Sequence, residues 1–365
     1  MTTRIAHGRP PRARQISNTR QTSRNRQTPG ARQTSSVERP LIILSPPRTF
    51  SSLIGSMLGR HPELYGLPEL QIWRRETLQA HWRYCLRENQ RMGDGLLRSV
   101  AELIFGGQTD ENIGLARGWI QRRGHLNVGL VVEILATQVR PLVIVDKSPS
   151  TVYRLEWMRR AYRLFPEARF LHLVRNPHGH AESVLRAIDD YGGPATAPRW
   201  LVQLTHFPSL DHSAGLGHFR DASGNGNLNG SASGNRKPDP QYAWFNLHSN
   251  ILNFLSEVPD GSKLRVRAED IVTNPDRELP QVVSWLGLRT DDEAIERMKH
   301  PERSPYACFG PPSAPFGNDP NFLRNPVLRP SRARLRNGDD TLYGREGGDG
   351  LTSEVRALAD VFGYS

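Results

Sequence analysis

The chain has few features that would tie it to an oxidising compartment, a membrane or a metal. It contains two cysteines among 365 residues, Cys85 and Cys308, which lie too far apart to form a metal-binding pair. Two isolated thiols are typical of a reducing compartment. No apolar h-region follows Met1, and no run of about 18 apolar residues occurs. We therefore expect a cytoplasmic protein that does not span a membrane and requires no metal.

Acidic residues are almost missing from the first 39 positions, which hold nine arginines and one glutamate, Glu38. This segment carries +8 of the formal net charge of +11, so residues 40–365 are nearly neutral. It is also poor in large aliphatic side chains, and it cannot bury enough apolar surface to offset the entropy lost on ordering. We predict a disordered Arg-rich tail over 1–39. The sequence leaves two alternatives for this tail: it contacts a polyanion nonspecifically, or it has no specific role.

The remaining residues, 40–365, read as one α/β domain. Short apolar runs predict buried parallel strands at 41–44, 142–145, 170–174 and 263–266. Apolar spacings of three and four, with capping residues, predict helices at 128–139, 155–165, 278–286 and 351–362. This alternation predicts three layers, with a central, mostly parallel sheet flanked by helices.

Two segments lack these periodic patterns. Eleven of the sixteen residues from 221 to 236 are Gly, Ser or Asn, which predicts a flexible insertion. Residues 301–350 are rich in proline and glycine, and we expect them to meander over the surface.

Glycine and lysine are both missing from the loop that follows the first strand, "SPPRTFSSL". A strand that turns directly into a helix leaves backbone N–H groups pointing at one spot, which the helix dipole makes electropositive. Thr49, Ser51 and Ser52 add hydroxyl donors. Arg48 adds a forked cation that matches a tetrahedral oxyanion. The loop predicts an oxyanion site; the alternative is a helix-capping cluster beside a surface arginine.

A second candidate oxyanion site lies in "ARFLHLVRNPHGHAESVLRA", residues 168–187. Arg175 follows a predicted strand, and Ser183 lies eight residues later in a predicted helix. An arginine at a strand end is often structural. Because the carboxyl ends of parallel strands meet at one edge of a sheet, however, we expect this segment to lie beside the first loop.

An ATP-dependent kinase is the main alternative among enzymes. Its phosphate loop would read G-x-x-x-x-G-K-[ST], which residues 45–53 do not contain. The run "PLVIVD", ending at Asp146, does resemble the strand whose terminal acid organises Mg²⁺ in such enzymes. A noncatalytic protein that binds nucleotides or polyanions through its basic tail is a third possibility.

Several segments resemble sulfotransferases that use 3′-phosphoadenosine 5′-phosphosulfate (PAPS). "SPPRTFSSL" resembles their 5′-phosphosulfate loop, and "FLHLVRNPHGHAESVL" is similar to their 3′-phosphate segment, with Arg175 and Ser183 in matching positions. "LRVRAEDIVTNPDRELPQVVSWLGL", "GNDPNFL" and a terminal "GY" extend the resemblance. "LPEL" and "VDKSPS" resemble the bacterial branch that includes sulfotransferase domains of polyketide assembly lines.

The resemblance implies a P-loop-NTPase-like sulfotransferase fold. It also implies transfer of a sulfuryl group from PAPS, the co-substrate, to a hydroxyl of a small molecule or a carrier-bound acyl chain. The PAPS-binding residues that it implies are Arg48, Thr49, Phe50, Ser51, Ser52, Leu53, Arg175 and Ser183. Many family members have glycine at the position of Phe50, whose ring must therefore point away or stack on a neighbour.

The sequence offers three candidate catalytic residues. Arg48 would stabilise charge on the transferring group. Glu69, in "YGLPELQIW", is the first candidate for the base, since the resemblance implies an acid in this stretch; the alternative is a structural pair with Arg74 or Arg75. His125 is the second candidate, because histidine titrates near neutral pH, although it also reads as a surface residue.

Two further positions bear on the chemistry. Lys147, in "VDKSPS", is expected to contact the sulfonate or the acceptor, or else to pair with Asp146. Gln71 stands where assembly-line members tend to have a histidine.

Overall fold

The computed structural model describes residues 39–88, 90–205, 239–330 and 350–364. The predicted tail, apart from Arg39, and the predicted insertion at 221–236 lie outside these ranges. These described residues belong to one compact unit. None of the described helices is long and apolar enough to cross a membrane.

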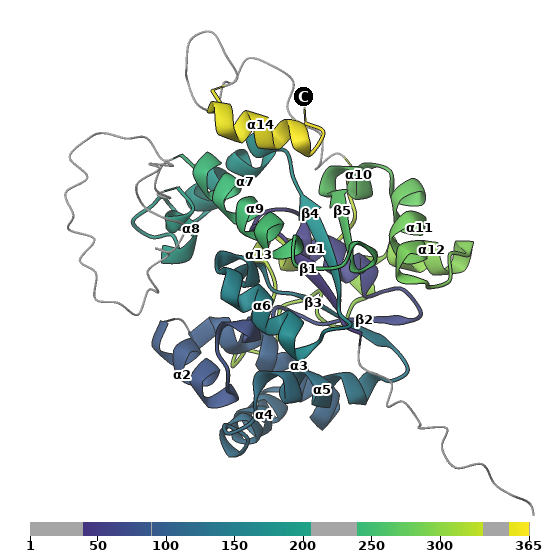
Figure 1. Cartoon of the computed structure of the whole chain (residues 1–365). Coiled ribbons are helices and arrows are strands. Elements are labelled where there is room, and N and C mark those ends of the chain that lie inside the picture. The colour runs from purple at the N-terminus through teal and green to yellow at the C-terminus, as the bar shows by residue number, and fades with distance from the viewer. Residues whose placement is uncertain (1–38, 89, 206–238, 331–349, 365) are drawn as a thin grey trace, which may run out of the picture. The chain divides into compact units, whose positions relative to one another are not determined.

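A five-stranded, all-parallel sheet occupies the centre of the fold, with strand order β2-β3-β1-β4-β5 (Figure 1). The strands are β1 (Leu41–Leu44), β2 (Leu64–Gly66), β3 (Val143–Lys147), β4 (Arg169–Val174) and β5 (Lys263–Arg267). The four predicted strands are confirmed to within two residues. The edge strand β2 was not predicted, because three residues are too few to show a periodic pattern.

Helices cover both faces of the sheet. Those built from the first half of the chain are α1 (Ser51–Leu58), α2 (Leu78–Glu88), α3 (Asp94–Phe105), α4 (Asp110–Arg122), α5 (Val128–Val139), α6 (Leu155–Leu164) and α7 (Pro177–Asp190). The later ones are α8 (Arg199–Gln203), α9 (Gln241–Leu255), α10 (Ala268–Thr273), α11 (Pro275–Leu286), α12 (Asp292–Met298), α13 (Pro320–Arg324) and α14 (Ser353–Val361).

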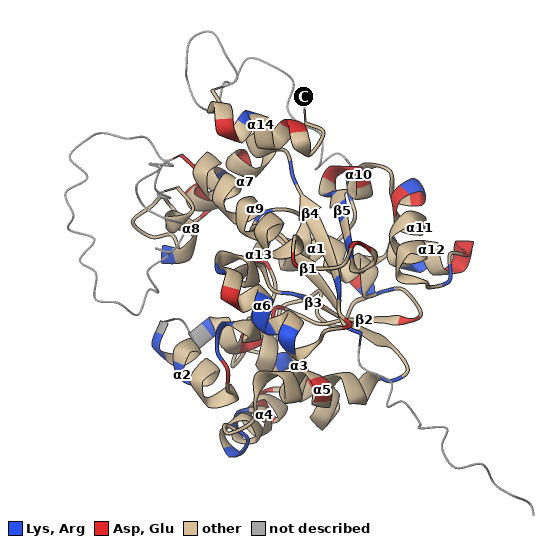
Figure 2. Ribbon diagram, in the orientation of Figure 1, with Lys and Arg blue, Asp and Glu red and all other residues tan. Residues whose placement is uncertain are grey.

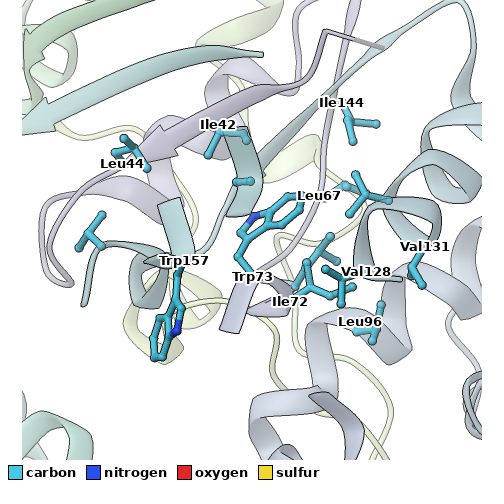
Figure 3. Close-up of a cluster of buried hydrophobic side chains, with 14 of the residues drawn as sticks. Ile42, Leu44, Leu67, Ile72, Trp73, Leu96, Val128, Val131, Ile144 and Trp157 are labelled. Carbon is cyan, nitrogen blue, oxygen red and sulfur yellow. The ribbon is translucent and has the colours of Figure 1, made fainter. Parts of the chain in front are cut away.

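The alternating side chains of β1 divide the core into two layers. Ile42 and Leu44 pack against residues of α3, α5, α6 and α9, in the cluster that also buries Trp73 (Figure 3). Leu41 and Ile43 face the opposite side and pack with α1, α10 and α11. Because each face of the sheet is buried, β1 is a continuous apolar run rather than an alternating one. The predicted three-layer α/β fold is confirmed.

Local signals set the ends of several helices. Asn127 caps α5 by accepting from the backbone N–H of Gly129 at 2.6 Å, and Gly287, with φ of 77°, ends α11. Helix α11 begins at Pro275, three residues before its predicted start, with the proline in the first turn. Helix α9 carries no charged side chain, as its plain tan ribbon shows, and Trp244 and Leu247 on it are fully buried (Figure 2).

The expected surface course of residues 301–350 is wrong for the part around Phe316. Asn318 is buried, and the backbone of Phe316 is held by helix α3 on both sides. Its N–H donates to the Asp94 carboxylate at 3.0 Å, and its carbonyl accepts from Arg98 Nη1 at 2.7 Å. These buried partners on a distant helix draw the segment inward, toward the carboxyl edge of the sheet.

Candidate active site

A cavity of about 310 Å³ lies at the carboxyl edge of the sheet, where the loops after β1 and β3 converge. Strand β1 pairs with β3 on one side and β4 on the other, so the loops after these three strands meet at one place. Of the predicted site residues, Arg48, Ser51, Ser52 and Glu69 line the cavity. Asn318 and Asp319 complete the wall on the side of the inward-drawn segment.

The loop after β1 has an unusual backbone. Arg48 and Phe50 have φ of 69° and 54°, in the left-handed region that residues with a side chain rarely adopt. Helix α1 follows with no side-chain cap and no acidic residue in its first turn. Its first backbone N–H groups have no intrahelical acceptor, and the helix dipole makes this end positive. The loop therefore presents uncapped donors to the cavity, and such strained backbone is common at functional sites.

Arg48 connects this loop to α7 and to the inward-drawn segment. Its Nε lies 3.2 Å from the Ser183 hydroxyl oxygen, and its Nη1 forms an ion pair with Asp319. Burial by itself would raise the pKa of Asp319, but the Arg48 guanidinium, the Asn321 backbone N–H and the Lys147 ammonium together outweigh it and hold this pKa below its usual value. Arg48 is thus fixed between two elements while still facing the cavity.

Arg175 lies directly behind Arg48. Its Nη1 donates to the Arg48 carbonyl oxygen at 2.5 Å, and its Cζ lies 4.2 Å from the centre of the Phe50 ring. Burial lowers the pKa of Arg175 to about 10, and its Nε has no hydrogen-bond partner among the described residues. Of the two orientations expected for the Phe50 ring, the structure therefore shows stacking, on the Arg175 guanidinium. Arg175, Ser183 and Arg48 converge, as their positions after neighbouring parallel strands predicted.

A buried lysine holds the candidate base. Lys147 Nζ lies 2.5 Å from Glu69 Oε1, 2.8 Å from the Ser52 hydroxyl oxygen and 3.0 Å from Asn318 Oδ1. The other oxygen of Glu69 accepts from Gln71 Nε2 at 2.8 Å. The alternative ion pair, between Glu69 and Arg74 or Arg75, therefore does not form. The suggested pairing of Lys147 with Asp146 does not form either.

Asp146 and Lys147 point to opposite faces of β3, because side chains alternate along a strand. The Asp146 carboxylate accepts from the Trp73 indole at 2.6 Å and from the Ser148 hydroxyl at 2.9 Å. It is 1% exposed and does not line the cavity, and burial raises its pKa to about 6. This carboxylate is occupied by two protein donors rather than turned toward a nucleotide site, which weighs against the kinase interpretation.

Two glycines allow the approach of Lys147 and Glu69. A Cβ on Gly95, in α3, would lie 2.1 Å from the Glu69 carbonyl oxygen, so only glycine fits there. A Cβ on Gly55, in α1, would lie 3.3 Å from the Lys147 Cβ, which leaves little space for a side chain. The backbone N–H of Glu69 also donates to the Gly317 carbonyl at 2.7 Å. Glu69 is therefore positioned by its main chain as well as by Lys147.

The other predicted residues lie farther from the cavity. His125 is exposed in the turn between α4 and α5 and is not among the lining residues. Thr49, in the loop after β1, and Leu53, in α1, are both buried. The Thr49 hydroxyl has no partner among the described residues. Sequence reasoning did not select Asn318 and Asp319 as site residues, although the motif that contains them, "GNDPNFL", was part of the resemblance.

Comparison with known proteins agrees with this geometry. Residues 40–208 match the profile described as the sulfotransferase family. This segment belongs to the sulfotransferase family. It contains Arg48, Glu69, Lys147, Arg175 and Ser183, whereas Asp319 lies beyond it. No curated protein matches the chain at a significant level.

Two solved structures share the sulfotransferase fold over most of the chain. The sulfotransferase domain from the curacin biosynthetic pathway is 22% identical, with a TM-score of 0.64 over 90% of this chain and 98% of that domain. The sulfotransferase domain from the Synechococcus PCC 7002 olefin synthase is 21% identical, with a TM-score of 0.62 over 91% of this chain and 98% of that one. The fold thus extends well past the segment that matches the family profile.

Proposed function

We propose that the protein is a PAPS-dependent sulfotransferase that acts on a hydroxyl of a small molecule or of a carrier-bound acyl chain. One observation carries the proposal: the Arg175 guanidinium donates to the Arg48 carbonyl oxygen at the uncapped start of α1, which brings two arginines to one place. The start of α1 with Arg48 suits a 5′-phosphosulfate. Arg175, whose buried Nε has no partner among the described residues, suits a 3′-phosphate together with Ser183, which contacts Arg48.

The chemistry requires attack by the acceptor oxygen on sulfur. A bond forms between that oxygen and sulfur, and the bond from sulfur to the 5′-phosphate oxygen breaks, so adenosine 3′,5′-bisphosphate leaves. Glu69 accepts the hydroxyl proton in our proposal. Arg48 and the N–H groups of α1 stabilise the negative charge that develops on the leaving phosphate and the sulfonate. The Lys147 ammonium donates to both the Ser52 hydroxyl and the Glu69 carboxylate, so it adds a cation between the donor and the base.

His125 is not part of this proposal, since its exposed turn lies outside the cavity lining. A carrier-bound acceptor follows from the resemblance to assembly-line sulfotransferases. The two related solved domains come from a biosynthetic pathway and an olefin synthase, which suits such an acceptor.

Binding measurements test the proposal directly. At about 100 times its Kd, adenosine 3′,5′-bisphosphate should stabilise the fold by roughly 2.7 kcal/mol in thermal unfolding. Mg²⁺-ATP and RNA are the parallel ligands, which represent the kinase and the polyanion-binding alternatives. Stronger stabilisation by either one, with none by the bisphosphate, would reject the proposal.

Arg48 provides the matched variants. Arg48→Ala should weaken bisphosphate binding and lower sulfate transfer, because Arg48 contacts the donor in the ground state and more strongly as charge develops. Arg48→Lys keeps the charge but loses the fork, so partial activity is expected. An Arg48→Ala protein that binds and transfers normally would remove the loop after β1 from the site.

A further inference from the structure

Arg74 is a buried cation in the cavity wall that has no acidic partner among the described residues. Its side chain lines the same cavity as Glu69 but is only 8% exposed. Among the described residues, its guanidinium donates to one acceptor, the Tyr84 hydroxyl, at 2.6 Å. Its Nε is fully buried and has no hydrogen-bond partner among them. A guanidinium has five N–H donors, so most of its hydrogen-bonding capacity is unused.

Aromatic rings surround the Arg74 guanidinium. Its Cζ lies 4.9 Å from the centre of the Trp157 ring, 5.3 Å from that of Tyr84 and 5.8 Å from that of Tyr153. Cation–π contacts offset part of the cost of burying a charge. They do not replace the hydrogen bonds that the N–H groups lose on leaving water, and buried charges are normally paired with an opposite charge.

Three other cations close to the cavity do have such partners. Lys147 pairs with Glu69, and Arg48 pairs with Asp319. Arg160, on the neighbouring helix α6, pairs with Glu76. Arg74 differs from these three cations, because no acidic side chain among the described residues pairs with it. Arg175, whose Nε also has no partner among those residues, is already assigned to the donor.

We propose that Arg74 binds an oxyanion, a carboxylate or a phosphate, carried by the acceptor. The acceptor is then a small hydroxylated oxyanion, with its hydroxyl at Glu69 and its anionic end at Arg74. This inference rests on the proposed function in taking the cavity as the acceptor site. Arg74 ends the 3-10 turn η1 (Ile72–Arg74), five residues after Glu69, and both side chains line one cavity.

The rest of the cavity suits such a molecule. Met92, Trp200, Leu201 and Phe316 line it and can cover a hydrocarbon body between the two polar ends. A volume of about 310 Å³ is at the lower end of the range for ligand pockets, and the sulfonate end of the donor shares it, which favours a small acceptor. Of the two proposed donor-binding cations, Arg48 also lines this cavity, from the loop after β1, whereas Arg175 is not among the lining residues.

Matched pairs of probes test the inference on the wild-type protein. Calorimetry without donor would measure binding of 3-hydroxybutyrate, 3-hydroxyoctanoate and 4-hydroxyphenylacetate, each beside its neutral methylamide, and of 3-hydroxybutyl phosphate. We expect at least one oxyanion to bind about ten- to a hundred-fold more tightly than its neutral counterpart, with the phosphate probe deciding between carboxylate and phosphate. The absence of any such preference, including no binding in any pair, overturns the inference.

Variants then assign the preference to Arg74. Arg74→Met keeps an unbranched apolar side chain among the rings and should reduce the affinity for the anionic probe to that for its neutral partner. Arg74→Lys should restore part of it. Arg123→Met is the control, because Arg123 stacks on Trp119 at 4.6 Å but does not line the cavity. If a folded Arg74→Met protein still prefers the anionic probe, another residue causes that preference and the inference is overturned.

Sulfate transfer separates this inference from the proposed function. Equal transfer from labelled PAPS to acids and methylamides would leave the proposed function standing and refute the role of Arg74. Arg74-dependent binding of anionic probes, without sulfation of any probe and without bisphosphate binding, would support the oxyanion site and reject the proposed function.

Discussion

Lys147 and Glu69 form an ion pair across the candidate active site, with 2.5 Å between Nζ and Oε1. The lysine is 2% exposed at the end of β3, and its two other partners, Ser52 and Asn318, come from α1 and the inward-drawn segment. One ammonium group therefore connects the proposed base with the proposed donor loop. In the proposed function, a sulfonate beside Ser52 would compete with Glu69 for this ammonium.

Glu69→Gln should separate chemistry from donor binding. Glu69 contacts Lys147 and Gln71 but none of the residues proposed to bind the nucleotide phosphates. We expect kcat to fall by about 10²–10⁴, the usual contribution of a positioned base, with unchanged affinity for adenosine 3′,5′-bisphosphate. Single-turnover sulfate transfer and calorimetry measure the two quantities. His125→Ala is the control and should behave as wild type; near-normal turnover in Glu69→Gln with a loss in His125→Ala would exchange their roles.

Arg175→Ala should affect binding of one phosphate group selectively. Arg175 offers a buried Nε that has no partner among the described residues, and we assign it to the 3′-phosphate together with Ser183, which contacts Arg48. The substitution should weaken binding of adenosine 3′,5′-bisphosphate by about 1.5–3 kcal/mol, the range for a charge-assisted hydrogen bond. Adenosine 5′-phosphate, which lacks the 3′ group, should lose much less affinity in the same titration. Equal losses for both ligands would contradict the assignment.

Phe50 allows the cost of the strained loop to be measured. Its φ of 54° favours glycine, while its ring stacks on Arg175. Phe50→Ala and Phe50→Gly both lose the ring, but only glycine adopts this conformation without strain. We expect the glycine variant to be more stable than the alanine variant by about 1 kcal/mol in urea unfolding. The reverse order would show that φ at residue 50 is not a source of strain.

Asp146 should make stability depend on pH in a defined direction. Burial raises its pKa to about 6 in the folded protein, above the value of about 3.9 in an unfolded chain. The folded state thus holds the proton more tightly, so the contribution of Asp146 to stability is full below about pH 4 and is lost as pH rises through about 6. The loss should be on the order of 2–3 kcal/mol.

The difference in unfolding free energy between wild type and Asp146→Asn isolates this contribution, because other groups titrate alike in both proteins. Urea unfolding between pH 4 and pH 7 should show that the wild type loses more stability than the variant. A constant difference across this range would mean that Asp146 titrates at its ordinary value.

Local signals in the sequence determined much of the fold. The apolar run 41–44 and the Asn127-capped helix 128–139 agree residue for residue with the structure, because burial on both faces and capping act over a few neighbouring residues. The meeting of Arg48, Arg175 and Ser183 was also predictable, since it follows from parallel strands that end at one edge. Family resemblance added the type of chemistry, which local patterns cannot supply.

Tertiary structure alone decided which charges pair. Lys147 and Glu69 lie 78 positions apart, and each has an oppositely charged residue nearer in sequence, Asp146 for one and Arg74 for the other. Strand alternation turns Asp146 to the opposite face of β3, and Arg74 ends among aromatic rings on η1, so neither local pair forms. The inward course of Phe316 depends in the same way on Asp94 and Arg98 of a distant helix. Pairing energies act through space between elements that only the folded sheet brings together, and no spacing along the chain records them.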